Sequence, residues 1–180
     1  YGLGNENKNL PGFIVICPGK ALPSHGTPLY GASFLPAYYQ GALVSNVSDP
    51  IANLSNARRS RQRQREQIDL IKQLNETHLR HREEDSRLSA RIESYEMAFR
   101  MQSTAPEAFD LSGESRATLD LYGCDHAKTD VFARQCLLAR RLVERGVRMV
   151  QVLHQTSSHT NKEWIWDQHS NLQSHLSNNC

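Results

Sequence analysis

Three side chains near the end of the chain are of types that bind metal ions. Asp167 and His169 lie two residues apart, and His154 precedes them at the end of an apolar run. Carboxylate oxygens and imidazole nitrogens are ligands that zinc-like or manganese-like ions accept. These residues form a candidate site for a divalent metal, zinc or manganese. The Asp-x-His triplet alone favours a second interpretation, in which Asp167 caps a helix and the histidines are solvated, because so short a pattern has low specificity.

The segment before this candidate site predicts a helix, a tight turn and a buried strand. Asp130 is a candidate cap for a helix with an apolar face, and Gly146 supplies the left-handed exit that follows many helices. Residues 147–153 are mostly apolar, which predicts an interior, parallel strand. Open α/β sheets bind ligands beyond the carboxyl ends of their strands, so an α/β fold would place the metal candidates there.

The rest of the chain predicts few further strands. Only Phe13–Cys17, which Pro18 ends, has the composition of a second strand. The sequence divides into four predicted blocks. Residues 1–50 form a loop-rich segment with this strand, and residues 51–105 form a helical hairpin with helices over 51–80 and 86–102. Residues 106–129 form a connector that turns Ala108 and Phe109 toward the core, and residues 130–180 form the helix, strand and loop that carry the metal candidates. Two strands are too few for a complete doubly wound sheet, so we expect residues 1–180 to be a fragment of a single domain.

Charge and cysteine content nominate no partner. The 180 residues carry a formal net charge of +2, which does not indicate a general nucleic-acid or membrane binder. An arginine run from Arg58 to Arg65 has no interleaved aromatic residues, so a solvated helix face is favoured over a nucleic-acid site. No apolar stretch is long enough for a membrane segment. The four cysteines are too far apart for a zinc knuckle and permit disulfides without requiring them.

Several longer motifs occur in order along nearly the whole chain. They are Tyr1–Asn7, Asn9–Phe13, Phe34–Pro36, Tyr39–Gly41, Arg91–Gln102, Ala108–Asp110, Ala139–Arg148 and Trp166–His169. In these motifs the chain resembles the bacterial sulfatase-like domain-of-unknown-function family fifteen-oh-one, related to the alkaline phosphatase superfamily. The resemblance implies part of a doubly wound alkaline-phosphatase-like or sulfatase-like sheet, here with an inserted helical hairpin, and often an exported protein, periplasmic or at the cell surface.

The same resemblance implies a metal-dependent chemistry. Hydrolases of that superfamily commonly hold a phosphate or sulfate ester with two metal ions, and a carboxylate and a histidine after a central strand usually serve one of them. This implies that Asp167 and His169 are metal ligands, with His154 as a further candidate. The substrate would be a small-molecule or saccharide ester.

Two departures limit what the resemblance carries over. Sulfatases make their nucleophile from a cysteine in Cys-x-Pro-x-Arg, whereas Cys17 is followed directly by Pro18 and the basic residue Lys20 comes one place early. The family's His-Gly-Gly-rich, Gly-Glu-Phe-Gly-Arg and Asp-His-His stretches are also absent, so no nucleophile can be named and the fragment alone is expected to be inactive. The leading hypothesis is a sulfatase-like hydrolase; the competing one is a non-catalytic cell-surface or carbohydrate-associated module that retains the fold.

Overall fold

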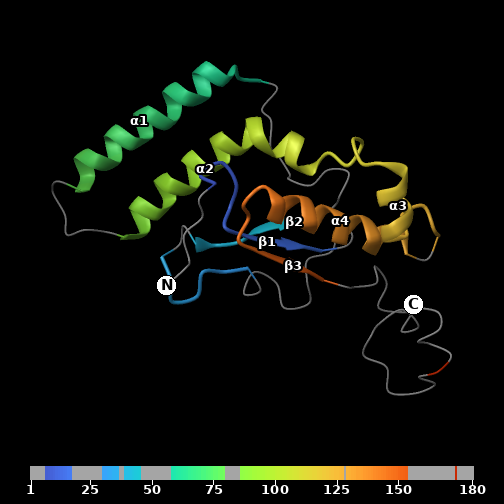
Figure 1. Ribbon diagram of the computed structural model, residues 1–180. Coiled ribbons are helices and arrows are strands. Elements are labelled where there is room, and N and C mark those ends of the chain that lie inside the picture. Colours follow the sequence, from blue (N-terminus) through green and yellow to red (C-terminus); the bar gives the residue numbers. More distant parts are fainter. Residues whose placement is uncertain are drawn as a thin grey trace.

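The computed structural model describes residues 7–17, 30–36, 39–45, 58–79, 86–127, 129–153 and 173. These residues form three strands and four helices. In chain order the elements are β1 (Phe13–Ile16), β2 (Ala42–Val44), α1 (Arg61–Leu79), α2 (Ser86–Phe109), α3 (Arg116–Tyr122), α4 (Asp130–Glu144) and β3 (Met149–Val152). The mixed α/β class expected from the sequence is confirmed (Figure 1).

The three strands form one parallel sheet in the order β2-β1-β3. Ile14 is the register partner of Ala42 on one side and of Val150 on the other. The strand predicted at Phe13–Cys17 is confirmed as β1 and lies at the centre. The prediction of two strands missed β2, because three residues are too few for a clear alternation of polar and apolar side chains.

The strand predicted over 147–153 is confirmed as the parallel strand β3, but its predicted interior position is wrong for the described sheet. There β3 is an edge strand beside β1, and the Met149 side chain is 56% exposed. The apolar run suggested an interior strand partly because it includes Val147. Val147 lies in the turn before β3, not in the strand, and its side chain is buried against the helical layer.

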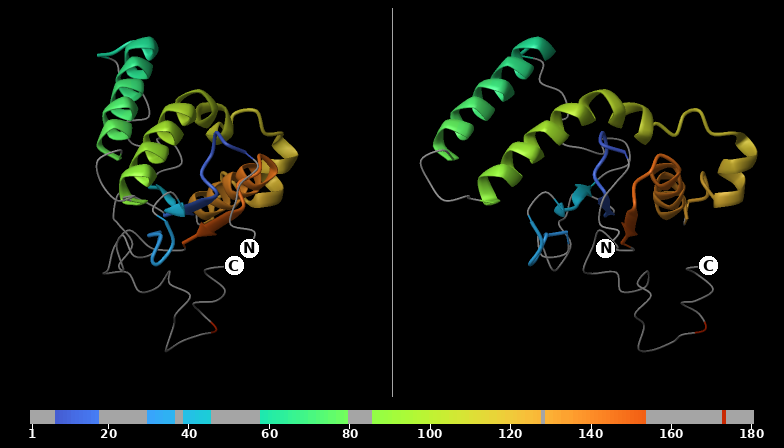
Figure 2. Two further views of the ribbon diagram at one scale, coloured as in Figure 1. Left: turned by 90° about the vertical axis from the view of Figure 1, so that its left-hand side faces the viewer. Right: turned by 60° about the vertical axis from the view of Figure 1, so that its left-hand side comes forward.

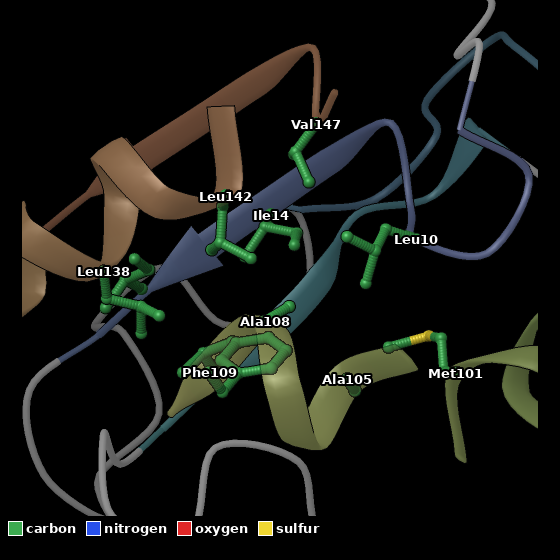
Figure 3. Close-up of a cluster of buried hydrophobic side chains, with 11 residues drawn as sticks. Leu10, Ile14, Met101, Ala105, Ala108, Phe109, Leu138, Leu142 and Val147 are labelled. Atoms are coloured by element: carbon green, nitrogen blue, oxygen red, sulfur yellow. The ribbon is translucent and has the colours of Figure 1, made fainter. Parts of the chain in front are cut away.

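Helices α2 and α4 pack against the same face of the sheet. Leu138 and Leu142 of α4 and Ala108 and Phe109 of α2 share one apolar cluster with Ile14 of β1 (Figure 3). Ile14 and Ile16 are two residues apart and therefore point to the same face. The described part of the molecule thus has two layers, and the predicted inward placement of Ala108 and Phe109 is confirmed.

The predicted helical hairpin is present as α1 and α2. Figures 1 and 2 show α1 beside the first half of α2 and away from the sheet. Arg65 donates hydrogen bonds of 2.8 and 2.7 Å to the Glu96 carboxylate, and it also pairs with Asp69. The guanidinium groups of Arg61 and Arg65 lie 5.2 and 5.5 Å from the centre of the Phe99 ring. Part of the arginine run therefore joins the two helices rather than forming only a solvated face.

The boundaries after the hairpin differ from those expected. Helix α2 continues to Phe109 with Pro106 inside it, and α3 occupies part of the predicted connector over 106–129. Burial of Ala105, Ala108 and Phe109 against the core offsets the backbone hydrogen bond that Pro106 cannot donate. The predicted connector therefore includes the end of α2 and the whole of α3.

Helix α4 has a cap different from the predicted one. Thr129 is the residue that caps it, without a side-chain hydrogen bond, and Asp130 is the first helical residue. The Asp130 carboxylate instead accepts hydrogen bonds from the Asp125 amide at 2.9 Å and from Arg134 at 2.7 Å. The predicted left-handed exit is confirmed, since Gly146 has a φ of 88°. This exit turns the chain back, so β3 runs antiparallel to α4.

Candidate functional site

The carboxyl ends of the three strands meet at one edge of the sheet. The Cys17 amide donates a hydrogen bond of 2.9 Å to the carbonyl of Val44, and the Leu153 amide donates one of 2.8 Å to the carbonyl of Ile16. The residues that leave β1, β2 and β3 are therefore side by side. Parallel α/β sheets bind their ligands in the crevice beyond this edge. We call it the carboxyl edge and take it as the candidate site.

The predicted metal ligands His154, Asp167 and His169 lie outside the described residues. His154 directly follows Leu153 in the sequence, and Leu153 is described. Within the described ranges no group of three or more His, Cys, Asp and Glu side chains could hold a metal ion. The structure therefore leaves the proximity of the three predicted ligands untested.

The donor set itself is suited to a divalent metal. Asp167 offers carboxylate oxygens, and His154 and His169 offer imidazole nitrogens. Zinc accepts three such protein ligands with an open position for water or substrate, and manganese accepts carboxylate readily. The residue types therefore fit the metal that the sequence predicts.

Cys17 leaves β1 at the carboxyl edge but has the properties of a packing residue. Its side chain is 1% exposed, and burial raises the pKa of the thiol. A raised pKa keeps the thiol protonated at neutral pH, whereas the nucleophilic form of cysteine is the thiolate. This burial agrees with the departure from the sulfatase cysteine motif at Pro18.

Gln135 of α4 is a buried polar residue that the sequence analysis did not single out. It is 1% exposed on α4, where the other buried residues are Ala133, Leu137, Leu138 and Leu142. No described hydrogen-bond partner reaches its side-chain oxygen Oε1. The one available signal was a polar residue on the otherwise apolar face of α4, since Gln135, Leu138 and Leu142 follow at spacings of three and four.

An open hollow of about 560 Å³ lies where α3 meets α4. Arg116, Asp125, His126 and Tyr122 are among its lining residues. The charged groups are paired: Arg116 lies 3.1 Å and Arg134 2.5 Å from the Asp125 carboxylate. Asp125 has a φ of 70°, and this left-handed turn directs its carboxylate toward both arginines. We interpret the cluster as the structure that holds the two helices together.

Glu114 ties the loop after α2 to α4. Its side chain is 9% exposed and accepts hydrogen bonds of 2.7 Å from Arg141 and 2.9 Å from Arg140. The hydrogen bond from Arg141 is the main reason why the pKa of Glu114 is lowered, with Arg140 adding to the effect and burial opposing it. This pair of arginines fixes the position of α4, which carries Gln135, relative to the loop that follows α2.

The family described as "Protein of unknown function (DUF1501)" matches residues 1–180. The chain belongs to this family. No curated protein and no solved structure matches the chain. The family named from the sequence motifs is therefore confirmed, while its relation to sulfatases and alkaline phosphatases remains a proposal.

The DUF1501 motifs coincide with contacts that hold the fold. The motif Arg91–Gln102 lies in α2, where Glu96 binds Arg65 and where Arg100 donates a hydrogen bond of 2.7 Å to the Lys8 carbonyl. The motif Ala139–Arg148 contains the arginine pair that binds Glu114 and the exit turn at Gly146. Among the described residues of this DUF1501 chain, no helix is long and apolar enough to span a membrane.

Proposed function

We propose that this DUF1501 chain is part of a metal-dependent hydrolase of phosphate or sulfate esters, with a sulfatase-like, doubly wound sheet. One observation carries the proposal: the parallel register brings the ends of β1 and β3 together directly before His154. Ligand sites of parallel sheets lie at such edges. The resemblance to sulfatase-like proteins supplies the reaction class, and it supports the proposal by analogy.

Asp167, His169 and His154 are the residues that would hold the metal. A bound divalent metal would offset negative charge on the oxygens of a phosphate or sulfate group. In the sequence His154 directly follows Leu153, whose amide is hydrogen-bonded to the last residue of β1. Cys17 is not assigned a role in bond cleavage, since its burial keeps the thiol protonated. The substrate class is a small-molecule or saccharide ester.

Metal analysis of the full-length protein tests the proposal. We expect stoichiometric zinc or manganese in the purified wild type, and loss of that metal in the variant that combines Asp167→Ala with His169→Ala. His175→Ala is the matched control, because it removes an imidazole that is close in sequence but is not among the proposed ligands. Hydrolysis of p-nitrophenyl phosphate and p-nitrophenyl sulfate should be lost with the metal. A metal-free, folded wild type without turnover would instead favour the non-catalytic cell-surface or carbohydrate-associated module.

We also propose, from the same resemblance, that the full-length protein is exported. Cell fractionation checks this directly. Recovery in the periplasmic or surface fraction supports the proposal, and recovery with a cytoplasmic marker enzyme contradicts it.

A further inference from the structure

The arginines at the start of α1 lie on two different sides of the helix. Arg61 and Arg65 face α2, because both guanidinium groups lie over the Phe99 ring and Arg65 is also paired with Glu96. Arg63 is two positions from each of them, and two residues turn a helix by about 200°. The Arg63 side chain therefore lies on the opposite side of α1, where it is exposed.

The side of α1 that carries Arg63 also carries two exposed leucines. Leu70 and Leu74 follow Arg63 after seven and eleven residues, close to two and three whole turns, so the three side chains lie along one side. The leucines are 56% and 57% exposed. Arg59, just before the helix, donates a hydrogen bond to Gln67, which is four residues after Arg63 and on the same side. We call Arg59, Arg63, Gln67, Leu70 and Leu74 the outer stripe.

The outer stripe faces away from the rest of the described fold. Figures 1 and 2 show α2 between α1 and the sheet. Helix α1 meets α2 through its other side, where Gln64 accepts a hydrogen bond of 2.7 Å from Gln102. A single exposed leucine on a protein surface is ordinary. Two exposed leucines on successive turns, in line with two exposed arginines, indicate a surface that meets a partner.

The charge of α1 is concentrated at its first turns. Residues 58–65 include five arginines and no acidic residue, whereas residues 66–79 include three acidic residues and one lysine. Arg58, Arg59 and Arg63 are exposed. Glu66 lies beside the outer stripe and accepts a hydrogen bond of 3.1 Å from Gln62. The exposed arginines outnumber this carboxylate, so the surface is complementary to an anionic partner, although the whole chain is nearly neutral.

A bilayer with anionic headgroups offers both contacts that the outer stripe can make. Guanidinium groups bind phosphate oxygens through paired hydrogen bonds. Leucines of an amphipathic helix enter the boundary between headgroups and acyl chains. A nucleic acid would engage the arginines only, because the outer stripe has no aromatic side chain on which bases could stack. The combination of residues therefore favours a lipid surface.

We propose that α1 binds the surface of an anionic lipid bilayer through the outer stripe, with Arg59 and Arg63 at lipid phosphates and Leu70 and Leu74 among the headgroups. The binding is peripheral and reversible, since two leucines bury little apolar area. Arg65 takes no part, because α2 holds it. This inference goes beyond the proposed hydrolysis and uses no residue of the proposed metal site.

Co-sedimentation of the full-length protein with vesicles tests the proposal. Vesicles of phosphatidylglycerol mixed with phosphatidylcholine are compared with vesicles of phosphatidylcholine alone, at a salt concentration of about 0.1 M. We expect the anionic vesicles to bind at least about 10-fold more tightly, with binding that weakens as salt is added. Hydrogen exchange of α1 amides should slow on these vesicles. Equal binding to both vesicles, no binding to either, or slowing in α4 instead of α1 overturns the proposal.

Removal of the outer arginines tests their part in binding. Arg59→Gln combined with Arg63→Gln should weaken binding to anionic vesicles by about 30-fold, because each arginine near such a surface contributes about fivefold. Arg116→Gln is the matched control, since it removes an arginine of α3 whose side chain is 72% exposed. It should bind as the wild type does. Equal losses in the two proteins overturn the assignment to α1.

Removal of the outer leucines tests the apolar contact. Leu70→Gln combined with Leu74→Gln should weaken vesicle binding by about 10-fold or more, because both side chains lose their apolar contact with the bilayer. Leu121→Gln, at an 83% exposed leucine of α3, should have no effect. All of these side chains are exposed, so the variants should fold, which circular dichroism checks. Unchanged vesicle binding by the double leucine variant overturns the proposal.

Heparin binding and sedimentation equilibrium separate a lipid surface from other partners. If the double leucine variant loses vesicle binding but keeps the wild-type affinity for heparin, the lipid assignment is supported. A wild type that binds heparin but no vesicles has a general polyanion site, which overturns the proposal. A wild type that binds no vesicles and forms a dimer that the leucine substitutions dissociate also overturns it, because the outer stripe then binds a second copy of the chain.

Discussion

The Glu114 carboxylate accepts a hydrogen bond of 2.7 Å from the guanidinium of Arg141. Arg140 donates a second hydrogen bond to the other carboxylate oxygen. The contact joins two segments far apart in the chain, the loop after α2 and the helix α4 that carries Gln135. Because the Glu114 side chain is 9% exposed, a change that removes its charge leaves two arginines without their shared partner.

Glu114→Gln should lower the free energy of unfolding by about 1–3 kcal/mol at neutral pH, because hydrogen bonds between charged groups are lost. The lowered pKa of Glu114 gives the pH dependence its sign. The wild-type advantage is fully present above the unfolded-state pKa, about 4.3, and is lost as the pH falls through the lower folded-state pKa. Urea unfolding at pH values above and below these two pKa values measures the difference in stability between the wild type and Glu114→Gln. Glu107→Gln is the matched change at an 84% exposed carboxylate and should have little effect.

Leu142→Ala should lower the free energy of unfolding by about 2–5 kcal/mol, because it leaves a cavity between α4 and β1. Leu142 is fully buried in the shared cluster. Chemical denaturation measures the loss of unfolding free energy, with the same dependence on denaturant concentration fitted to both proteins. The same substitution at Leu121, which is 83% exposed, should change stability only slightly. Equal losses at the two positions would contradict the assignment of the core.

Gly123→Ala should destabilise the junction of α3 and α4 by about 1–2 kcal/mol. Gly123 has a φ of 76°, and a Cβ there would lie 3.1 Å from Thr129 Oγ1. Thr129 also donates a hydrogen bond to the Gly123 carbonyl. Gly113→Ala is the comparison, since no atom lies within 4 Å of a Cβ at that position. Thermal denaturation of both variants checks the difference, and a Gly123→Ala protein as stable as Gly113→Ala would contradict it.

Arg65→Gln should loosen α1 without affecting the sheet, because Arg65 connects α1 to Glu96 and to the face of the Phe99 ring. Hydrogen exchange should accelerate roughly two- to fivefold for α1 amides and remain unchanged for β1. Arg63→Gln removes a guanidinium from an exposed position of the same helix and should leave both rates as they are. Faster exchange in β1 on Arg65→Gln would show that the hairpin supports the core.

Sequence patterns predicted the elements whose signal is local. The apolar run at Phe13–Cys17 gave β1, and the positive φ of Gly146 followed from its place after an amphipathic helix. The order of the strands in the sheet could not be predicted from local sequence patterns. Whether β1 or β3 lies at the centre depends on which edges pair, and both strands are similarly apolar.

The site was less predictable than the fold. Residue type nominated His154, Asp167 and His169 as metal ligands, and these remain predictions. Gln135 was not nominated, because a single glutamine on a helix has no distinctive chemistry until its burial is known. The extent of α2 was missed for a related reason: the penalty of Pro106 is visible in the sequence, whereas the burial that offsets it is tertiary.

The central place of β1 sets the order of assembly during synthesis. Ile14 is translated before its partner Val150, and the four described helices lie between them in the chain. Until then one side of β1 has backbone donors and acceptors without a strand to pair with. The nascent chain must therefore keep this apolar strand from pairing with another molecule, and a chaperone that binds exposed apolar segments would protect it.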